Sequence, residues 1–151
     1  MAGNTYKATV RYAGDGFFIG TPPSGHAQIM DSKGDRRAAP TPLEMLLVSV
    51  AACTALDVQS ILAKKRQDVT GYDVFVEADQ AEEPPAVFTR IRIRHMVTGH
   101  DIDEEALKQA IRLSEEKYCA VGNMLNKNAA VATTYEIVAE KENVRELTLV
   151  Q

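Results

Sequence analysis

The stretch that decides the fold is Thr41–Arg66, TPLEMLLVSVAACTALDVQSILAKKR. Its first residue is a favourable helix N-cap, Pro42 suits the first helical position, and Glu44 completes an S/T-x-x-E capping box. No charged residue occurs in Met45–Leu56, so a helix here is apolar on every side and needs cover on every side. The sequence therefore predicts one long buried helix around which the rest of the chain folds.

Length and composition favour an ordinary globular domain. The chain has 151 residues, of which 45% are hydrophobic and 25% are charged. The net charge of -4 and the absence of a basic face argue against nucleic-acid binding. The uncharged run 45–56 is shorter than the ~20 residues that span a bilayer, and the N-terminus has no apolar signal core. We therefore expect a cytoplasmic protein that does not enter membranes.

The order of the elements indicates an α+β fold. Short strands are expected around 6–12, 17–19 and 27–30, before the long helix. After the long helix we expect an antiparallel hairpin over 71–78 and 87–98, a second helix from Asp103 and a last strand over 130–139. We expect a single domain over 1–140 and a tail over 141–151, which is either disordered or an extra edge strand.

Two features of this pattern bear on partners. One sheet and one further helix cover about two sides of an all-apolar helix, so the sequence predicts a homodimer that buries the rest. Arg90, Arg92 and Arg94 alternate with apolar residues along one strand. They could form an anion site, but the alternation is typical of a solvated strand face, which is the interpretation favoured here.

Two cysteines carry the candidate chemistry, and each has a plain structural explanation. A cysteine in an apolar helix, such as Cys53, is usually a small hydrophobic residue, and burial makes a thiol less reactive unless a cation lies near. The pattern around Cys119 leaves open whether the second helix continues or breaks there. Neither a C-x-x-C motif nor a Cys/His cluster is present, so no zinc site is expected. A reactive thiol in an apolar cleft with a second thiol in reach would suit a two-cysteine peroxide reductase.

Two segments resemble the OsmC/Ohr family of bacterial proteins. They are APTPLEMLLVSVAACTAL at 39–56 and EKYCAVGNML at 116–125, each with one cysteine. SGHAQIMD at 24–31 and DVQSILAKKRQDV at 57–69 resemble a less characterised branch of that family. The resemblance covers the chain to about Glu140.

The resemblance implies an OsmC-like fold with antiparallel sheets packed around two central helices in an intertwined homodimer. It implies that Cys53 is the peroxidatic cysteine and that Cys119 resolves its sulfenic acid to a disulfide. A dithiol reductant such as a lipoylated protein would restore the thiols, and no metal or bound cofactor would be needed. The implied function is reduction of organic hydroperoxides in oxidative-stress defence.

The sequence departs from the well-studied peroxidases at the groups that activate the thiol. The family's carboxylate ten residues before the helix cysteine is Leu43 here, with Glu44 one residue later. The family's arginine lies in an early loop, but 14–20 contains none, which makes Arg36 and Arg37 the candidate substitutes. These departures keep a second function open, namely a non-catalytic protein that binds a small ligand or senses redox state.

Overall fold

The structure is a computed structural model that describes residues 3–33 and 35–140. The chain forms two compact units, Met1–Val48 and Ser49–Gln151, called here the N-terminal and C-terminal units. The expected boundary between domain and tail lies at 140, and the tail falls outside the described residues. The single domain over 1–140 stays a prediction.

The N-terminal unit contains a three-stranded antiparallel sheet. Its strands are β1 (Thr9–Gly14), β2 (Phe17–Thr21) and β3 (Gln28–Asp31), in the order β1-β2-β3. Gly14 and Gly16 in the β1–β2 turn have φ of 94° and 80°, which glycine tolerates without a steric penalty. The three strands predicted from alternation are therefore present, with bounds shifted by a few residues.

The long helix α1 runs over Pro42–Lys64 and contributes residues to both units. The predicted capping box is present, because Thr41 N–H donates to Glu44 Oε2 at 2.7 Å and Glu44 N–H donates to Thr41 Oγ1 at 3.3 Å. One stripe of α1 is buried, Val50, Thr54, Val58 and Leu62, at a spacing of one turn. Within a single chain the helix is therefore covered on one side rather than on all sides.

By length and composition alone, α1 could cross a membrane, with a mean hydropathy of 1.8 over its most apolar window. A single such helix is weak evidence, since the core helix of a soluble protein passes the same test. The absence of a membrane segment stays a prediction from the sequence.

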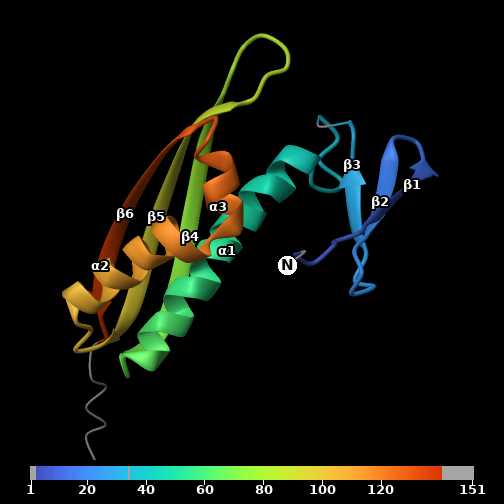
Figure 1. Cartoon of the computed structure of the whole chain (residues 1–151). Helices are drawn as coiled ribbons and strands as arrows, with labels where there is room; N and C mark the ends of the chain where they lie inside the picture. The colour runs from blue at the N-terminus through green and yellow to red at the C-terminus, as the bar shows by residue number, and fades with distance from the viewer. Residues whose placement is uncertain (1–2, 34, 141–151) are drawn as a thin grey trace, which may run out of the picture. The chain divides into compact units, whose positions relative to one another are not determined.

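The C-terminal unit packs helices on one face of a second sheet (Figure 1). β4 (Asp68–Gln80) pairs antiparallel with β5 (Phe88–His100), which confirms the predicted hairpin. β6 (Ala130–Ala139) pairs with β5 in parallel, which differs from the antiparallel sheets expected from the sequence. The reason is the helical crossover between β5 and β6, since a parallel pair needs a long connection.

That crossover consists of α2 (Glu104–Leu113), a single π-helical turn η1 (Ser114–Tyr118) and α3 (Ala120–Leu125). α2 begins at the predicted cap, where Asp103 accepts a hydrogen bond from Glu105 N–H at 3.0 Å. Two buried clusters join the helices to the sheet, and one contains Leu62, Val97 and Leu107. Each fully buried aliphatic side chain contributes roughly 1.5–3 kcal/mol.

The arginines of β5 lie on the solvated face of this sheet. Arg92 pairs with Asp79 at 2.7 Å, and Arg94 pairs with Glu136 at 3.3 Å. Ile91 and His95, on the other face, are buried. The interpretation of the three arginines as a solvated strand face is confirmed.

Candidate functional site

The two cysteines meet in the core of the C-terminal unit. Cys53 lies on α1, and Cys119 is the N-cap of α3. Their Sγ atoms and a carboxylate oxygen of Asp57 all lie within 4.8 Å of one another. Both thiols are free, and Cys119 is 3% exposed while Cys53 is half-buried. The structure therefore brings together the two cysteines singled out in the sequence.

The helix breaks at Cys119, which settles the question that spacing left open. Its backbone N–H donates to Ser114 O at 2.8 Å across the π-helical turn. Its backbone then turns extended, with φ of -71° and ψ of 95°, and its Sγ accepts a hydrogen bond from Gly122 N–H at 3.2 Å. Single π turns recur at functional sites because they redirect side chains. Here the turn directs the thiol back toward α1.

Asp57 completes the cluster and was not predicted as a site residue. It follows Cys53 by four residues on α1, so both side chains lie on one helix face. Ser114 Oγ donates to Asp57 Oδ2 at 3.0 Å and shares a second hydrogen bond of 3.1 Å with Thr54 Oγ1. Because Ser114 is fully buried, these contacts fix the carboxylate beside the thiols. The i, i+4 spacing from Cys53 was the sequence signal that could have identified it.

Among the described residues, no lysine or arginine side chain forms an ion pair with this cluster. Lys64 and Lys65 line a neighbouring cavity of about 360 Å³ together with Asp57. Within 3–33 and 35–140, however, no lysine or arginine forms an ion pair with Asp57. The cluster thus consists of three groups that become negative on ionisation.

Burial raises the pKa of the Cys119 thiol, and the adjacent Cys53 thiol raises it further. The Gly122 N–H opposes this effect, and the charge of Asp57 adds to it. Removal from water disfavours a thiolate, and so do neighbouring groups of like charge. Cys119 is therefore protonated at neutral pH when nothing else is bound.

A small cavity of about 130 Å³ opens beside Cys119. Its lining combines apolar and polar side chains: Val50, Thr54, Ile93, Glu115, Cys119, Gly122, Asn126 and Val131. A cavity of about 150 Å³ lined by apolar residues is known to bind benzene. The cavity beside Cys119 is slightly smaller than that and partly polar, so it leaves room for a short alkyl group next to a thiol.

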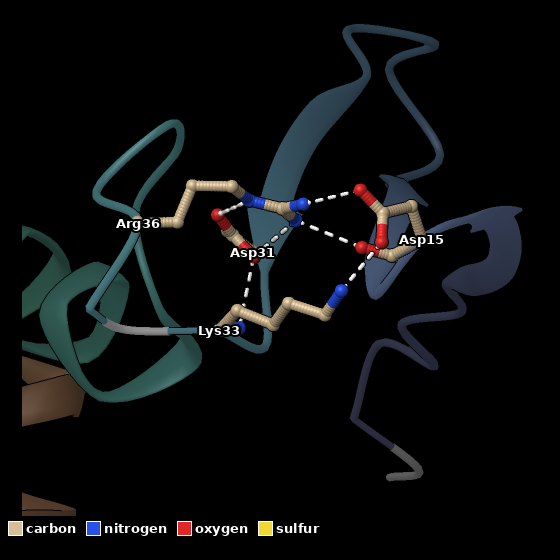
Figure 2. A network of polar contacts seen from close by, with 4 residues as sticks. All are labelled: Asp15, Asp31, Lys33 and Arg36. Atoms are coloured by element: carbon tan, nitrogen blue, oxygen red, sulfur yellow. Dashed lines mark hydrogen bonds and ion pairs between the residues drawn. The ribbon is translucent and has the colours of Figure 1, made fainter.

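Arg36, a predicted thiol activator, belongs to an ionic network in the N-terminal unit (Figure 2). Its guanidinium donates to both carboxylate oxygens of Asp31, at 2.8 and 2.7 Å, and to Asp15 Oδ2 at 2.6 Å. Lys33 contacts Asp15 through its side chain and donates its backbone N–H to Asp31 at 2.8 Å. Asp31 is 0% exposed, and the Arg36 hydrogen bonds hold its pKa at about 2. The guanidinium therefore serves to neutralise a buried carboxylate.

Glu44 and Arg37, the other two predicted site residues, lie near each other in the N-terminal unit. The Thr41 backbone N–H lowers the pKa of Glu44, the Thr41 hydroxyl adds to this, and Arg37 makes a smaller contribution. The Glu44 side chain is thus engaged as the helix cap. Arg37 forms no salt bridge among the described residues and has a φ of 51°. It is the predicted cation that the ionic network leaves uncommitted.

Comparisons with known proteins agree with this architecture. The family model described as OsmC-like protein matches residues 32–145. Protein YhfA of Escherichia coli strain K12 is 42% identical over 134 residues, or 88% of this chain and 98% of YhfA. An OsmC-like protein from Mycoplasma pneumoniae has a TM-score of 0.78 at 16% identity, over 89% of this chain and 98% of that chain. The organic hydroperoxide resistance protein OhrB of Bacillus subtilis has a TM-score of 0.60 at 15% identity, over 88% of this chain and 98% of OhrB.

Proposed function

Because the chain belongs to the OsmC-like family, we propose that it is a thiol-dependent peroxidase that reduces organic hydroperoxides. Membership of this family supports a redox role or a role in the response to oxidative stress. The observation that carries the finer proposal is the approach of Cys53 Sγ and Cys119 Sγ to within 4.8 Å. A disulfide needs an S–S distance of about 2.05 Å, so the two sulfur atoms would have to approach by up to about 2.7 Å.

The proposed reaction has three steps. The Cys53 thiolate attacks the hydroperoxide, the O–O bond breaks, and the leaving alkoxide takes a proton to give an alcohol and a Cys53 sulfenic acid. The Cys119 thiol then condenses with the sulfenic acid to form the Cys53–Cys119 disulfide and water. A dithiol reductant, such as a lipoylated protein, exchanges with this disulfide and restores both thiols.

The exposure of the two thiols supports the roles proposed for them. Cys53 is half-buried and can meet a peroxide from solvent, whereas Cys119 is almost completely buried. The small cavity beside Cys119 supports an organic substrate, since it could hold an alkyl group. Glu44, Arg36 and Arg37 remain proposed members of the site, and of the two arginines only Arg36 forms salt bridges among the described residues.

We further propose that the protein acts in the cytoplasm as a homodimer built around α1. The helix exposes Leu56 at 72% and Val48 at 60%, although both are apolar. Exposed apolar side chains on a central helix are typical of a surface that a second copy covers. Members of this family are typically homodimers, which supports the same assembly.

The test is consumption of cumene or tert-butyl hydroperoxide by the reduced protein with a dithiol reductant. Wild type should turn over, and Cys53→Ser should lower kcat/KM by roughly 10³-fold or more. Cys119→Ser should retain the first oxidation and accumulate a sulfenic acid that dimedone traps. If wild type and Cys53→Ser consume peroxide equally slowly, the peroxidase proposal is wrong. Retention of a small ligand by unreactive protein would then favour the binding alternative.

A further inference from the structure

We propose that Cys53, Asp57 and Cys119 bind a thiophilic divalent cation, Zn²⁺ in its most direct form, when the protein is reduced. The sequence predicted no zinc site, because it has neither paired C-x-x-C motifs nor a Cys/His cluster. The structure assembles the donors differently, with two from one face of α1 and one from the break before α3. This inference concerns the same thiols as the proposed peroxidase but does not depend on that activity.

The donor set suits zinc in number and kind. Zinc sites that keep an open position use three protein ligands, and thiolates select zinc over magnesium or calcium. Zn–S bonds of about 2.3 Å and Zn–O bonds of about 2.1 Å place tetrahedral donors roughly 3.5–3.8 Å apart. The three donor atoms lie within 4.8 Å of one another, so shifts of about 1 Å would complete the site. The half-buried Cys53 and Asp57 leave the fourth position open to water.

The surroundings of Asp57 hold it as a ligand. Its Oδ2 accepts from the buried Ser114 hydroxyl, whereas its Oδ1 takes part in no hydrogen bond among the described residues. Carboxylates that bind metals are themselves commonly hydrogen-bonded, and such contacts orient the ligand. Ser114 belongs to the same π-helical turn that positions Cys119. One short segment thus places a ligand and its supporting hydrogen bond.

The negative charge of the ionised donors favours the binding of a cation. Two thiolates and one carboxylate would bring three negative charges together with no lysine or arginine paired to them among residues 3–33 and 35–140. A divalent ion would compensate most of that charge, and coordination deprotonates a thiol outright. Oxidation by a hydroperoxide would remove the site. Two thiolates, ROOH and two protons give the disulfide, ROH and water, and Zn²⁺ is released.

The experiment uses the full chain, reduced, freed of metal with a chelator and kept anaerobic. Co²⁺ should bind one per chain and give a strong thiolate-to-cobalt charge-transfer absorption, which Zn²⁺ then displaces. Cys53→Ser and Cys119→Ser should each lower Co²⁺ affinity at least tenfold and weaken that absorption. Asp57→Asn should lower Zn²⁺ affinity by about 10–100-fold, and Ser114→Ala should lower it by about 10-fold. Asp73→Asn, an exposed carboxylate on β4, is the matched control and should change nothing.

Circular dichroism and thermal melting establish that each variant is folded before its affinity is interpreted. The inference is overturned if folded wild type shows no charge-transfer absorption, or if binding is unaffected by Cys53→Ser. Peroxide turnover is measured separately on the metal-free protein. Failure of metal binding with intact turnover leaves the peroxidase proposal standing. Metal binding without turnover leaves the zinc site standing alone.

Discussion

Two clusters of ionisable groups in this molecule differ in whether a group of opposite charge lies beside each member. In the N-terminal unit, Arg36 and Lys33 meet Asp15 and Asp31, and every one of these groups has an opposite charge beside it (Figure 2). In the C-terminal unit, Cys53, Asp57 and Cys119 gather with no lysine or arginine paired to them within 3–33 and 35–140. Removal of one partner from a buried ion pair destabilises a fold, whereas ionisable groups that gather without such a partner are candidates for binding or reaction.

The largest effect is expected where pairing is broken in the N-terminal unit. Arg36→Ala leaves the buried Asp31 carboxylate without its bidentate partner, and removal of one partner of a buried pair is strongly destabilising. We expect the amides of β2 and β3 to lose hydrogen-exchange protection. Arg37→Ala, which removes an exposed cation, is the matched control and should preserve protection. Equal protection in both variants would mean that the network is not structural.

Acidification should destabilise the C-terminal unit at a higher pH than the N-terminal unit. Burial lowers the pKa of His95 from 6.5 to about 4, so the unfolded chain binds a proton first and stability falls as pH drops from 6.5 to 4. The loss for the C-terminal unit is roughly 3 kcal/mol. The depressed pKa of Asp31, about 2 against 3.8, acts in a lower pH range and costs the N-terminal unit stability only below about pH 4.

Urea unfolding between pH 7 and 4, followed by amide signals of β5, measures this difference. His95→Gln keeps a side chain that can hydrogen-bond the Tyr72 hydroxyl, which lies 2.6 Å from Nδ1 in wild type, and removes the titrating ring. We expect its stability to depend on pH much less than that of wild type. An unchanged slope would assign the acid sensitivity to other groups.

The exposed face of α1 gives an intermediate effect. Leu56→Lys places a charge at an apolar position that is 72% exposed in the single chain. If a second copy covers this position, the dimer dissociation constant should rise about tenfold or more, which sedimentation equilibrium measures. Gln109→Lys, at an exposed polar position of α2, is the control for added charge away from the exposed face of α1. A monomeric wild type, or a variant that dimerises equally well, would contradict the homodimer.

The smallest effect is expected from Arg37, and it tests whether this arginine activates the Cys53 thiol. Arg37 is the predicted activator for which the described part of the chain shows no salt bridge. Arg37→Ala should lower the rate of Cys53 oxidation by organic hydroperoxide a few-fold without changing thermal stability. Arg37→Lys should recover part of that rate. An unchanged rate in both variants would remove Arg37 from the proposed site.

Local signals in the sequence were sufficient for much of the fold. The capping box at Thr41 and Glu44 and the alternation of β4 and β5 depend on neighbouring residues, and both are present in the structure. The parallel pairing of β6 was missed because it depends on the path of a long crossover. Spacing alone also could not show that the helix breaks at Cys119.

The site shows the same division between local and long-range information. Cys53 and Cys119 were identified as candidates, but only the fold shows that their sulfur atoms approach. Asp57 was overlooked because a carboxylate near the end of an apolar helix is ordinarily solvated. The sequence also could not reveal that Asp15 and Asp31 engage the Arg36 guanidinium, and the role of Arg36 as a thiol activator stays a prediction.

One measurement tests the coupling of the two thiols most directly. Reduced, metal-free wild type receives one equivalent of cumene hydroperoxide, and its peptides are analysed by mass spectrometry without reduction. Proximity of the sulfur atoms predicts one Cys53–Cys119 disulfide per chain, reversible by a dithiol. Oxidation of Cys53 to sulfinic acid with Cys119 still a thiol, or no oxidation at all, would contradict the two-cysteine mechanism.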